Sequence, residues 1–217
     1  MLTEKPKPTK STHIIQHNLS EQVYQLIKQM ILSGQIKGGE KIPEIEISER
    51  LGVSRTPIRE ALRRLQQLGL IINEPRKFAY VKHLDQTEAA DIAEVRLSLE
   101  KLIIQLLATS QYSINLSHAQ ELQQDCIKST REGDFATSYV IDSHIHLELA
   151  KLTGNVHLLD LYERLDTRIH LLRLKQKVPK MGLLTYVQQH ETLFKYIKDK
   201  KFEMGQVLIE QHIMHDL

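Results

Sequence analysis

The sequence predicts a mainly α-helical protein with two domains. Apolar residues recur three and four positions apart along most of the 217 residues, which is the spacing of amphipathic helices. Charge divides the chain as well: residues 1–84 carry 14 Lys and Arg against 8 Glu and no Asp, whereas residues 85–217 carry 15 basic and 19 acidic residues. We therefore expect a basic N-terminal domain that faces a polyanion, and an acidic helical domain that does not.

Composition narrows the class of protein. No apolar run reaches 18 residues, so we expect no membrane span, and the one cysteine, Cys126, fits a reducing cytoplasm because it has no internal partner. Residues 1–18 carry three lysines and two prolines but no apolar segment, which predicts a disordered basic arm rather than a signal peptide. The N-terminal domain would then span residues 19–84 and the helical domain residues 85–217.

Two helices are predicted before residue 52. The first begins near Ser20 and stops at Gly34, a residue well suited to a helix C-terminus. Its core face is formed by Val23, Leu26, Ile27, Met30 and Ile31. Pro43 can open a short second helix, because the first helical turn has no N–H bond to lose, and that helix would bury Ile47 and Leu51.

A third helix follows the glycine turn at Gly52 and has two faces. Ser54 can cap it, and Pro57 falls in its first turn. The inward face consists of Ile58, Ala61, Leu62 and Leu65, and the outward row consists of Arg55, Arg59 and Arg63. The second helix of a helix-turn-helix reads DNA bases with such N-terminal residues. An ordinary surface helix with solvated arginines would have the same spacing.

A hairpin is predicted next, with strands at residues 70–72 and 79–81. It would form the wing of a winged helix-turn-helix. Arg76 and Lys77 near its tip would then reach phosphate or the minor groove. A basic hairpin tip is usually just solvated, so this interpretation depends on the position of the hairpin after the third helix.

The run from Leu51 to Leu65, with Ser-Arg-Thr-Pro followed by Arg-Glu-Ala-Leu, resembles the signature of the GntR family of bacterial transcription regulators. The resemblance implies that the third helix enters the major groove, with Arg55, Thr56 and Arg59 on bases and Ser54 on phosphate. Two positions depart from the family pattern. Ile45 stands where the family usually has a DNA-contacting arginine, and Phe78 stands where it usually has a wing-tip glycine, so we expect an operator unlike the ordinary family one.

From residue 85 the pattern is helical. Asp85, with Glu88 three residues on, resembles a capping box at the start of a long helix. The apolar stripe of that helix consists of Ile92, Val95, Leu99, Leu102 and Leu106, and such a stripe is either core or a dimer seam. Further helices are predicted at residues 115–131, 134–153, 155–177, 183–199 and 202–216, with breaks at Gly133, Gly154 and Pro179.

Asp142 and His146 are four residues apart, so a carboxylate and an imidazole share one helix face and could bind one metal ion, while His144 points elsewhere. This pair alone is a weak signal. Together with Gly154-Asn155, Gln189-His190-Glu191 and Gln211-His212, the two residues resemble the landmarks of the FCD ligand-binding domain of the FadR subgroup, over residues 88–217.

That resemblance implies a divalent metal ion held by Asp142, His146, His190 and His212 inside a helical bundle. The ligand types suit zinc, nickel, iron or manganese. The alternative is that the four side chains line a polar cavity and hydrogen-bond one another or water. Arg96 matches the subgroup's arginine and would bind the carboxylate of an effector, unless it only pairs with Glu100 on the same helix.

The sequence thus predicts a cytoplasmic, effector-responsive bacterial transcription regulator, most often a repressor, and not an enzyme. Its partners would be double-stranded operator DNA of roughly palindromic sequence, a second copy of the chain and a small organic acid. Two alternatives stay open: the metal itself is the signal, or the helical domain is a metalloenzyme fused to a DNA-binding module. Against the enzyme, no motif supplies a general base beside the metal ligands.

Overall fold

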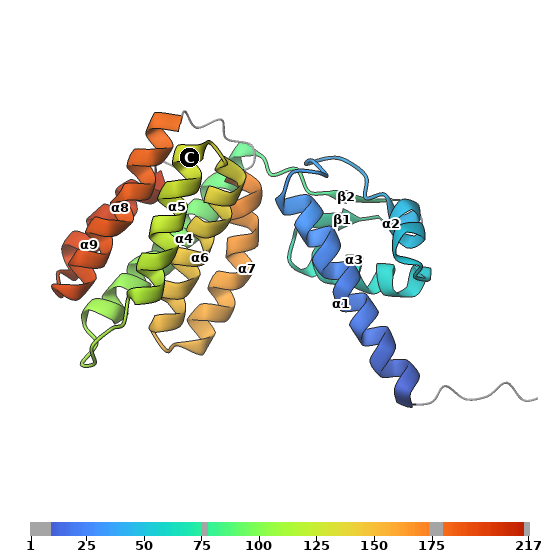
Figure 1. Cartoon of the computed structure of the whole chain (residues 1–217), viewed down its shortest axis with the longest axis horizontal. Helices are drawn as coiled ribbons and strands as arrows, with labels where there is room; N and C mark the ends of the chain where they lie inside the picture. Colours follow the sequence, from blue (N-terminus) through green and yellow to red (C-terminus); the bar gives the residue numbers. More distant parts are fainter. Residues whose placement is uncertain (1–9, 75–77, 174–179, 215–217) are drawn as a thin grey trace, which may run out of the picture. The chain divides into compact units, whose positions relative to one another are not determined.

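The computed structural model describes residues 10–74, 78–173 and 180–214. The chain forms two compact units that meet between His83 and Leu84, within one residue of the expected domain boundary (Figure 1). The architecture is mainly α, as the periodicity predicts, with a small hairpin in the first unit and helices alone in the described part of the second.

The first unit contains three helices and a hairpin. They are α1 (Lys10–Leu32), α2 (Glu44–Leu51), α3 (Arg55–Gln67), β1 (Ile71–Asn73) and β2 (Ala79–Val81). Helix α1 packs along α3, and their shared core includes Val23, Ile27, Ile31, Ala61 and Leu65. In the hairpin, Ile71 pairs with Val81 and Asn73 with Ala79 in antiparallel register. Arg76 and Lys77, the predicted wing-tip contacts, lie outside the described residues.

Two expectations for this unit are wrong in detail. Helix α1 begins at Lys10, so it includes residues 10–18 of the expected disordered arm. The reason is that no proline or glycine interrupts the chain between Pro8 and Gly34. Leu51 is exposed rather than buried, because the left-handed Gly52 that ends α2 turns the chain and brings Val53 into the core instead.

The second unit is a bundle of six helices among the described residues. They are α4 (Gln86–Ala108), α5 (Ser117–Glu132), α6 (Phe135–Leu152), α7 (Val156–Arg173), α8 (Lys180–Lys198) and α9 (Phe202–Met214). Helix α4 contacts α6, α7, α8 and α9, while α5 packs on α6 and α8. The Asp85 carboxylate accepts from the Glu88 N–H at 2.8 Å, which confirms the predicted cap. Gly133 and Gly154 make the expected turns, and Pro179 lies outside the described residues.

The predicted apolar stripe of α4 does not form its core face. Val95 and Leu102 are 52% and 39% exposed, and only Ile92 of the stripe is fully buried. The core face instead combines apolar residues with two charged ones: Ile92, Ala93, Arg96, Glu100, Ile103, Ile104 and Leu107. The two charged residues can face inward because each meets polar groups there. Leu99 and Leu106 of the stripe pack partly buried against the core, and only Val95 and Leu102 remain exposed to another molecule.

Close packing fixes α9 against α4. Gly205 lies in α9, and a Cβ atom at this position would stand only 2.7 Å from Cγ2 of Ile104. The absence of a side chain thus lets the two helices approach, and this approach determines where the end of α9 lies. Among the described residues, none of these helices is both long enough and apolar enough to cross a membrane.

Candidate functional site

The first candidate site is the exposed face at the N-terminus of α3. Ser54 occupies the N-cap position but makes no capping bond with its side chain. Arg55, Thr56 and Arg59 are exposed, while the apolar residues of the helix point into the core. The structure therefore places the four predicted DNA-contacting residues of this segment on one accessible helix end.

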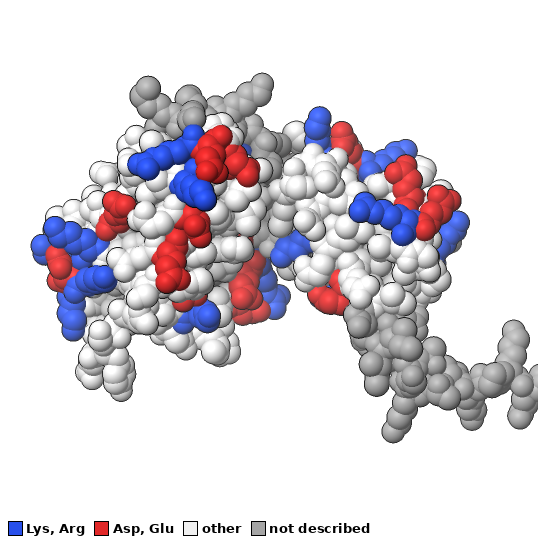
Figure 2. All heavy atoms as spheres, viewed as in Figure 1, with Lys and Arg blue, Asp and Glu red and all other residues white. Residues whose placement is uncertain are grey.

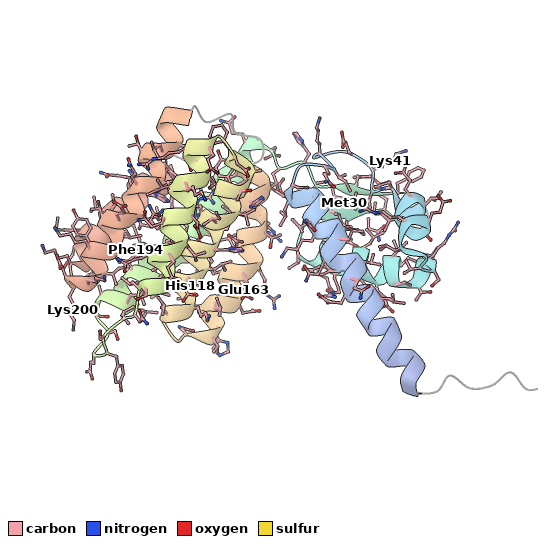
Figure 3. All side chains as sticks on the ribbon, viewed as in Figure 1. Met30, Lys41, His118, Glu163, Phe194 and Lys200 are labelled. Atoms are coloured by element: carbon pink, nitrogen blue, oxygen red, sulfur yellow. The ribbon has the colours of Figure 1, made fainter. Side chains whose placement is uncertain are left out.

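A surface hollow of about 550 Å³ adjoins this helix end. Its lining includes Arg55 and Arg59 together with Ile45 and Phe78, the two departures from the family pattern. Ile45 is 66% and Phe78 55% exposed, and the ammonium of Lys41, labelled in Figure 3, lies 3.8 Å from the centre of the Phe78 ring. These departures thus present apolar surface beside the arginines. On the face shown in Figure 2, Lys and Arg alternate with Asp and Glu over both units.

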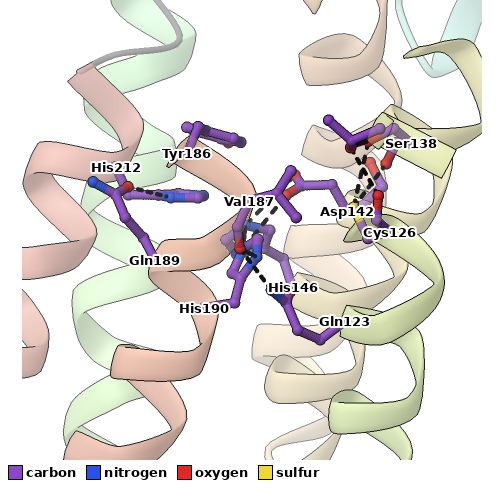
Figure 4. A network of polar contacts seen from close by, with 12 residues as sticks. Gln123, Cys126, Ser138, Asp142, His146, Tyr186, Val187, Gln189, His190 and His212 are labelled. Atoms are coloured by element: carbon purple, nitrogen blue, oxygen red, sulfur yellow. Dashed lines mark hydrogen bonds and ion pairs between the residues drawn. The ribbon is translucent and has the colours of Figure 1, made fainter. Parts of the chain in front are cut away.

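The second candidate site is a buried cluster of four side chains from three helices. Asp142 and His146 come from α6, His190 from α8 and His212 from α9, and each is at most 1% exposed. One ligand atom from each lies within 4.8 Å of the other three (Figure 4). The ligand atoms of a tetrahedral zinc-sized ion stand about 3.4 Å apart, so a contraction of the cluster would bring all four onto one ion.

His144, between the two α6 ligands, is exposed and lines a different hollow. That hollow lies among α5, α6 and α7, and His118 and Glu163, labelled in Figure 3, also line it. The helical spacing therefore separates His144 from the cluster, as predicted.

Each histidine of the cluster has an acceptor behind it. Nδ1 of His146 lies 2.8 Å from Oε1 of Glu100, and Nδ1 of His190 lies 3.0 Å from the Val187 carbonyl oxygen. Nδ1 of His212 lies 2.9 Å from Oε1 of Gln189. The oxygens of Val187 and Gln189 accept from Nδ1 of His190 and His212, so Nε2 of these two rings keeps its lone pair. Nδ1 of His146 lies within ion-pair distance of Glu100 but makes no hydrogen bond of good geometry with it. Metal-binding histidines in proteins have this arrangement.

The four side chains of the cluster have no hydrogen to share among their converging atoms, and the hydrogens that reach them come from Arg96 and Arg173. Nε2 of His190 lies 3.2 Å from Nε2 of His146 and 3.3 Å from Oδ1 of Asp142. Nε2 of His212 is buried and has no hydrogen-bond partner among the described residues. Acceptors that face acceptors in a buried site are costly, and a cation would satisfy them. This pattern favours a metal ion over a network in which the four residues hydrogen-bond one another.

Protonation states at neutral pH also suit a metal. Burial lowers the pKa of His190 to about 4, against the opposing effect of Asp142, and it lowers the pKa of His212 as well. Burial would raise the pKa of Asp142, but Arg173 and the neighbouring histidines hold it well below its usual range. The cluster thus offers an ionised carboxylate at Asp142 and neutral imidazoles at His190 and His212, the forms that bind metal.

Two buried arginines flank the cluster. Nη2 of Arg96 lies 3.4 Å from Nε2 of His146, and its Nε lies 3.6 Å from Oε1 of Glu100. The predicted Arg96 thus reaches the cluster and forms the alternative ion pair at the same time. Arg173 of α7, which sequence reasoning missed, places Nη2 2.5 Å from Oδ2 of Asp142 and donates to Tyr186 at 2.6 Å. A cavity of about 20 Å³ lies between these arginines and aliphatic side chains.

Glu100 was also missed as part of the site. It is fully buried, and it contacts His146, Arg96 and Tyr162. Its only signal in the sequence is its position four residues after Arg96, which fits a surface ion pair equally well. No spacing rule places Arg173 near Asp142, because the two residues belong to different helices.

Comparison with known families and proteins covers both units. Residues 19–81 match the family described as bacterial regulatory proteins, gntR family, and residues 91–215 match the FCD domain. Over 196 residues the chain is 28% identical to the Bacillus subtilis (strain 168) protein "Uncharacterized HTH-type transcriptional regulator YdhC", covering 90% of this chain and 88% of that protein.

Two further similarities agree with these matches. The chain is 26% identical over 162 residues to the "Probable D-xylose utilization operon transcriptional repressor" of Paenarthrobacter nicotinovorans, covering 73% of this chain and 70% of that one. The solved structure titled "E. coli McbR/YncC" matches with a TM-score of 0.79 and 22% identity, over 90% of this chain and 93% of the other. That structural likeness shows a common fold.

Proposed function

Because the chain belongs to the GntR family of bacterial transcription regulators and carries an FCD domain, we propose that it is a metal-dependent, effector-controlled repressor. A small carboxylate would bind at the metal and change the affinity for operator DNA. The observation that carries this proposal is that one buried carboxylate and three buried imidazoles each offer a ligand atom within 4.8 Å of the others. Relatives named as transcription regulators agree with the expectation that the protein is not an enzyme.

In the first unit, Arg55, Thr56 and Arg59 contact base edges in the major groove, and Ser54 contacts phosphate. Their exposure at the N-terminus of α3 supports this assignment. Arg76 and Lys77 serve the wing as phosphate or minor-groove contacts. Ile45 and Phe78, beside the arginines, contribute apolar contacts where the family usually has arginine and glycine.

In the second unit, Asp142, His146, His190 and His212 hold zinc, nickel, iron or manganese. The four side chains would hold the ion, and the bound ion would attract the carboxylate of the effector. Arg96 balances the effector's charge, as its position at 3.4 Å from His146 supports. The ion supplies Lewis acidity toward that carboxylate, and the protein supplies its orientation and the exclusion of water.

The active form is a homodimer in the cytoplasm on a roughly palindromic operator. The exposed apolar residues of α4, Val95 and Leu102, form its seam in the second unit. Effector binding changes the spacing of the two recognition helices and so changes DNA affinity. By linkage, DNA must alter effector affinity by the same factor.

Native mass spectrometry of the untagged protein, before and after chelation, tests this proposal. We expect a dimer that carries a metal ion and a small bound mass on each chain, and operator binding that responds when this small molecule is added. If chelation and re-addition of metal switch DNA binding without any organic ligand, the metal itself is the signal. A metal-free chain with no bound mass would overturn the sensor site and leave the DNA-binding assignment intact.

A further inference from the structure

Glu100 lies behind the metal cluster, on α4, with no exposed surface. We propose that Glu100 is a positioning residue that holds His146 in the orientation and tautomer required for metal binding. This inference rests on the proposed metal site. It adds a residue outside the four ligands and assigns a purpose to a buried charge.

Glu100 differs chemically from the oxygen groups that face the other two histidines. Of the three oxygens behind the cluster's histidines, those of Val187 and Gln189 belong to neutral amides, whereas that of Glu100 belongs to a carboxylate. A carboxylate behind an imidazole fixes the ring and increases its basicity as a ligand. His146 should therefore be the strongest nitrogen donor of the three.

The carboxylate of Glu100 is itself held in place by a neighbouring helix. The hydroxyl of Tyr162, a residue of α7 that is 1% exposed, donates to the same Oε1 atom that faces His146. Burial and the adjacent Glu100 raise the pKa of Tyr162 well above its ordinary value, so the hydroxyl keeps its hydrogen and remains a donor. The carboxylate is thus fixed from α7 while it faces a ligand on α6.

Arg96 contacts both Glu100 and His146. Its Nε lies 3.6 Å from Oε1 of Glu100, while its Nη2 lies 3.4 Å from Nε2 of His146. An arginine can only donate, so its approach to Nε2 requires the hydrogen of His146 to be on Nδ1, facing Glu100. Arg96 therefore favours the same tautomer as Glu100, but through a longer contact, 3.4 Å against 2.8 Å.

Metal affinity of the full-length protein, measured by competition of Zn²⁺ with a chromogenic chelator, tests the inference. Glu100→Gln keeps an acceptor of the same shape but removes the charge, and we expect it to weaken Zn²⁺ binding roughly 10- to 100-fold. Tyr162→Phe should weaken it less, because it only loosens the carboxylate. Glu148→Gln is the matched control: Glu148 is partly buried on α6 and pairs with Lys151, and its loss should leave affinity unchanged.

A second measurement separates positioning from general damage. In the metal-free protein, ¹⁵N shifts of the histidine ring should show His146 protonated at Nδ1, and Glu100→Gln should give a mixture of tautomers because an amide can accept or donate. Thermal unfolding without metal identifies a variant that fails to fold, in which case Tyr162→Phe decides. Zn²⁺ affinity of Glu100→Gln equal to wild type would overturn the inference. A wild-type protein that binds no metal would instead refute the proposed site.

Discussion

At the residue scale, burial holds His190 and His212 of the cluster neutral, and this has a consequence for stability. The unfolded chain takes up a proton at His190 near its ordinary pKa of 6.5, whereas the folded chain does so only near 4. Between these values the unfolded state binds more protons, so acidification favours unfolding. Asp142 and Glu100 have lowered pKa values in the folded chain. The stability that they contribute is therefore lost at lower pH, below the ordinary carboxyl pKa values.

We therefore predict that the metal-free protein loses stability as the pH falls from about 6.5 to 4. His190 alone would account for on the order of 3 kcal/mol, because each pKa unit corresponds to about 1.36 kcal/mol. Urea unfolding of chelator-treated protein across this range measures the effect. His190→Asn should flatten the dependence, and an equally steep profile in this variant would show that other groups cause it.

His146 and His144 differ by two positions on α6 but face opposite environments. We predict that His146→Ala removes most of the bound metal, because it deletes a ligand and leaves Glu100 without its imidazole partner. His144→Ala should retain the wild-type metal content, since His144 lines a surface hollow. Elemental analysis of the purified proteins measures both. Equal metal content in the two variants would remove His146 from the ligand set.

At the element scale, α3 combines a packed face with an exposed N-terminal end. The packed face, which includes Ile58 and Leu65, fixes the helix on α1, so the exposed end is held rigidly. We predict that Arg55→Ala and Arg59→Ala each weaken operator binding by about 1–3 kcal/mol and relax base preference. Arg131→Ala, at the end of α5, serves as a control for lost positive charge.

Titration of labelled operator and of scrambled DNA at one salt concentration separates the loss of base readout from the loss of positive charge. A selective loss on the operator identifies base readout. An equal loss on both DNAs would reduce the arginines to phosphate contacts, and unchanged affinity in both variants would disprove the recognition-helix assignment.

At the scale of the whole molecule, the exposure of Val95 and Leu102, two large apolar residues of α4, is the feature that packing within the chain does not explain. Large exposed apolar side chains in a row are typical of surfaces that meet another protein. The proposed dimer would cover Val95 and Leu102 and place two recognition helices under one two-fold axis.

We predict that Leu102→Glu shifts the protein from dimer to monomer in light scattering, because it buries an unpaired charge in the seam. Leu161→Glu places the same charge on an exposed apolar residue of α7 and should leave the dimer intact. Operator affinity should fall with the loss of the dimer. A Leu102→Glu protein that remains dimeric would place the seam elsewhere.

The sequence by itself determined most of the local structure. Helical periodicity located the described helices to within a few residues, except for the start of α1, which lies about ten residues before the expected one. Asp85 marked the start of α4, and Gly133 and Gly154 marked turns, because these signals depend on neighbouring residues alone. The four residues of the cluster could be named from resemblance to a family, since their order along the chain is distinctive.

Only the tertiary structure decided which face of α4 is buried and which charges surround the cluster. Periodicity shows that residues share a helix face, but not which face meets another helix, so the stripe of Val95 and Leu102 was assigned inward as one alternative and lies outward in this chain. Arg173 and Glu100 are buried because their partners come from other helices. A charge stays in a core only where such partners converge, and that convergence is a property of helix packing rather than of spacing along the chain.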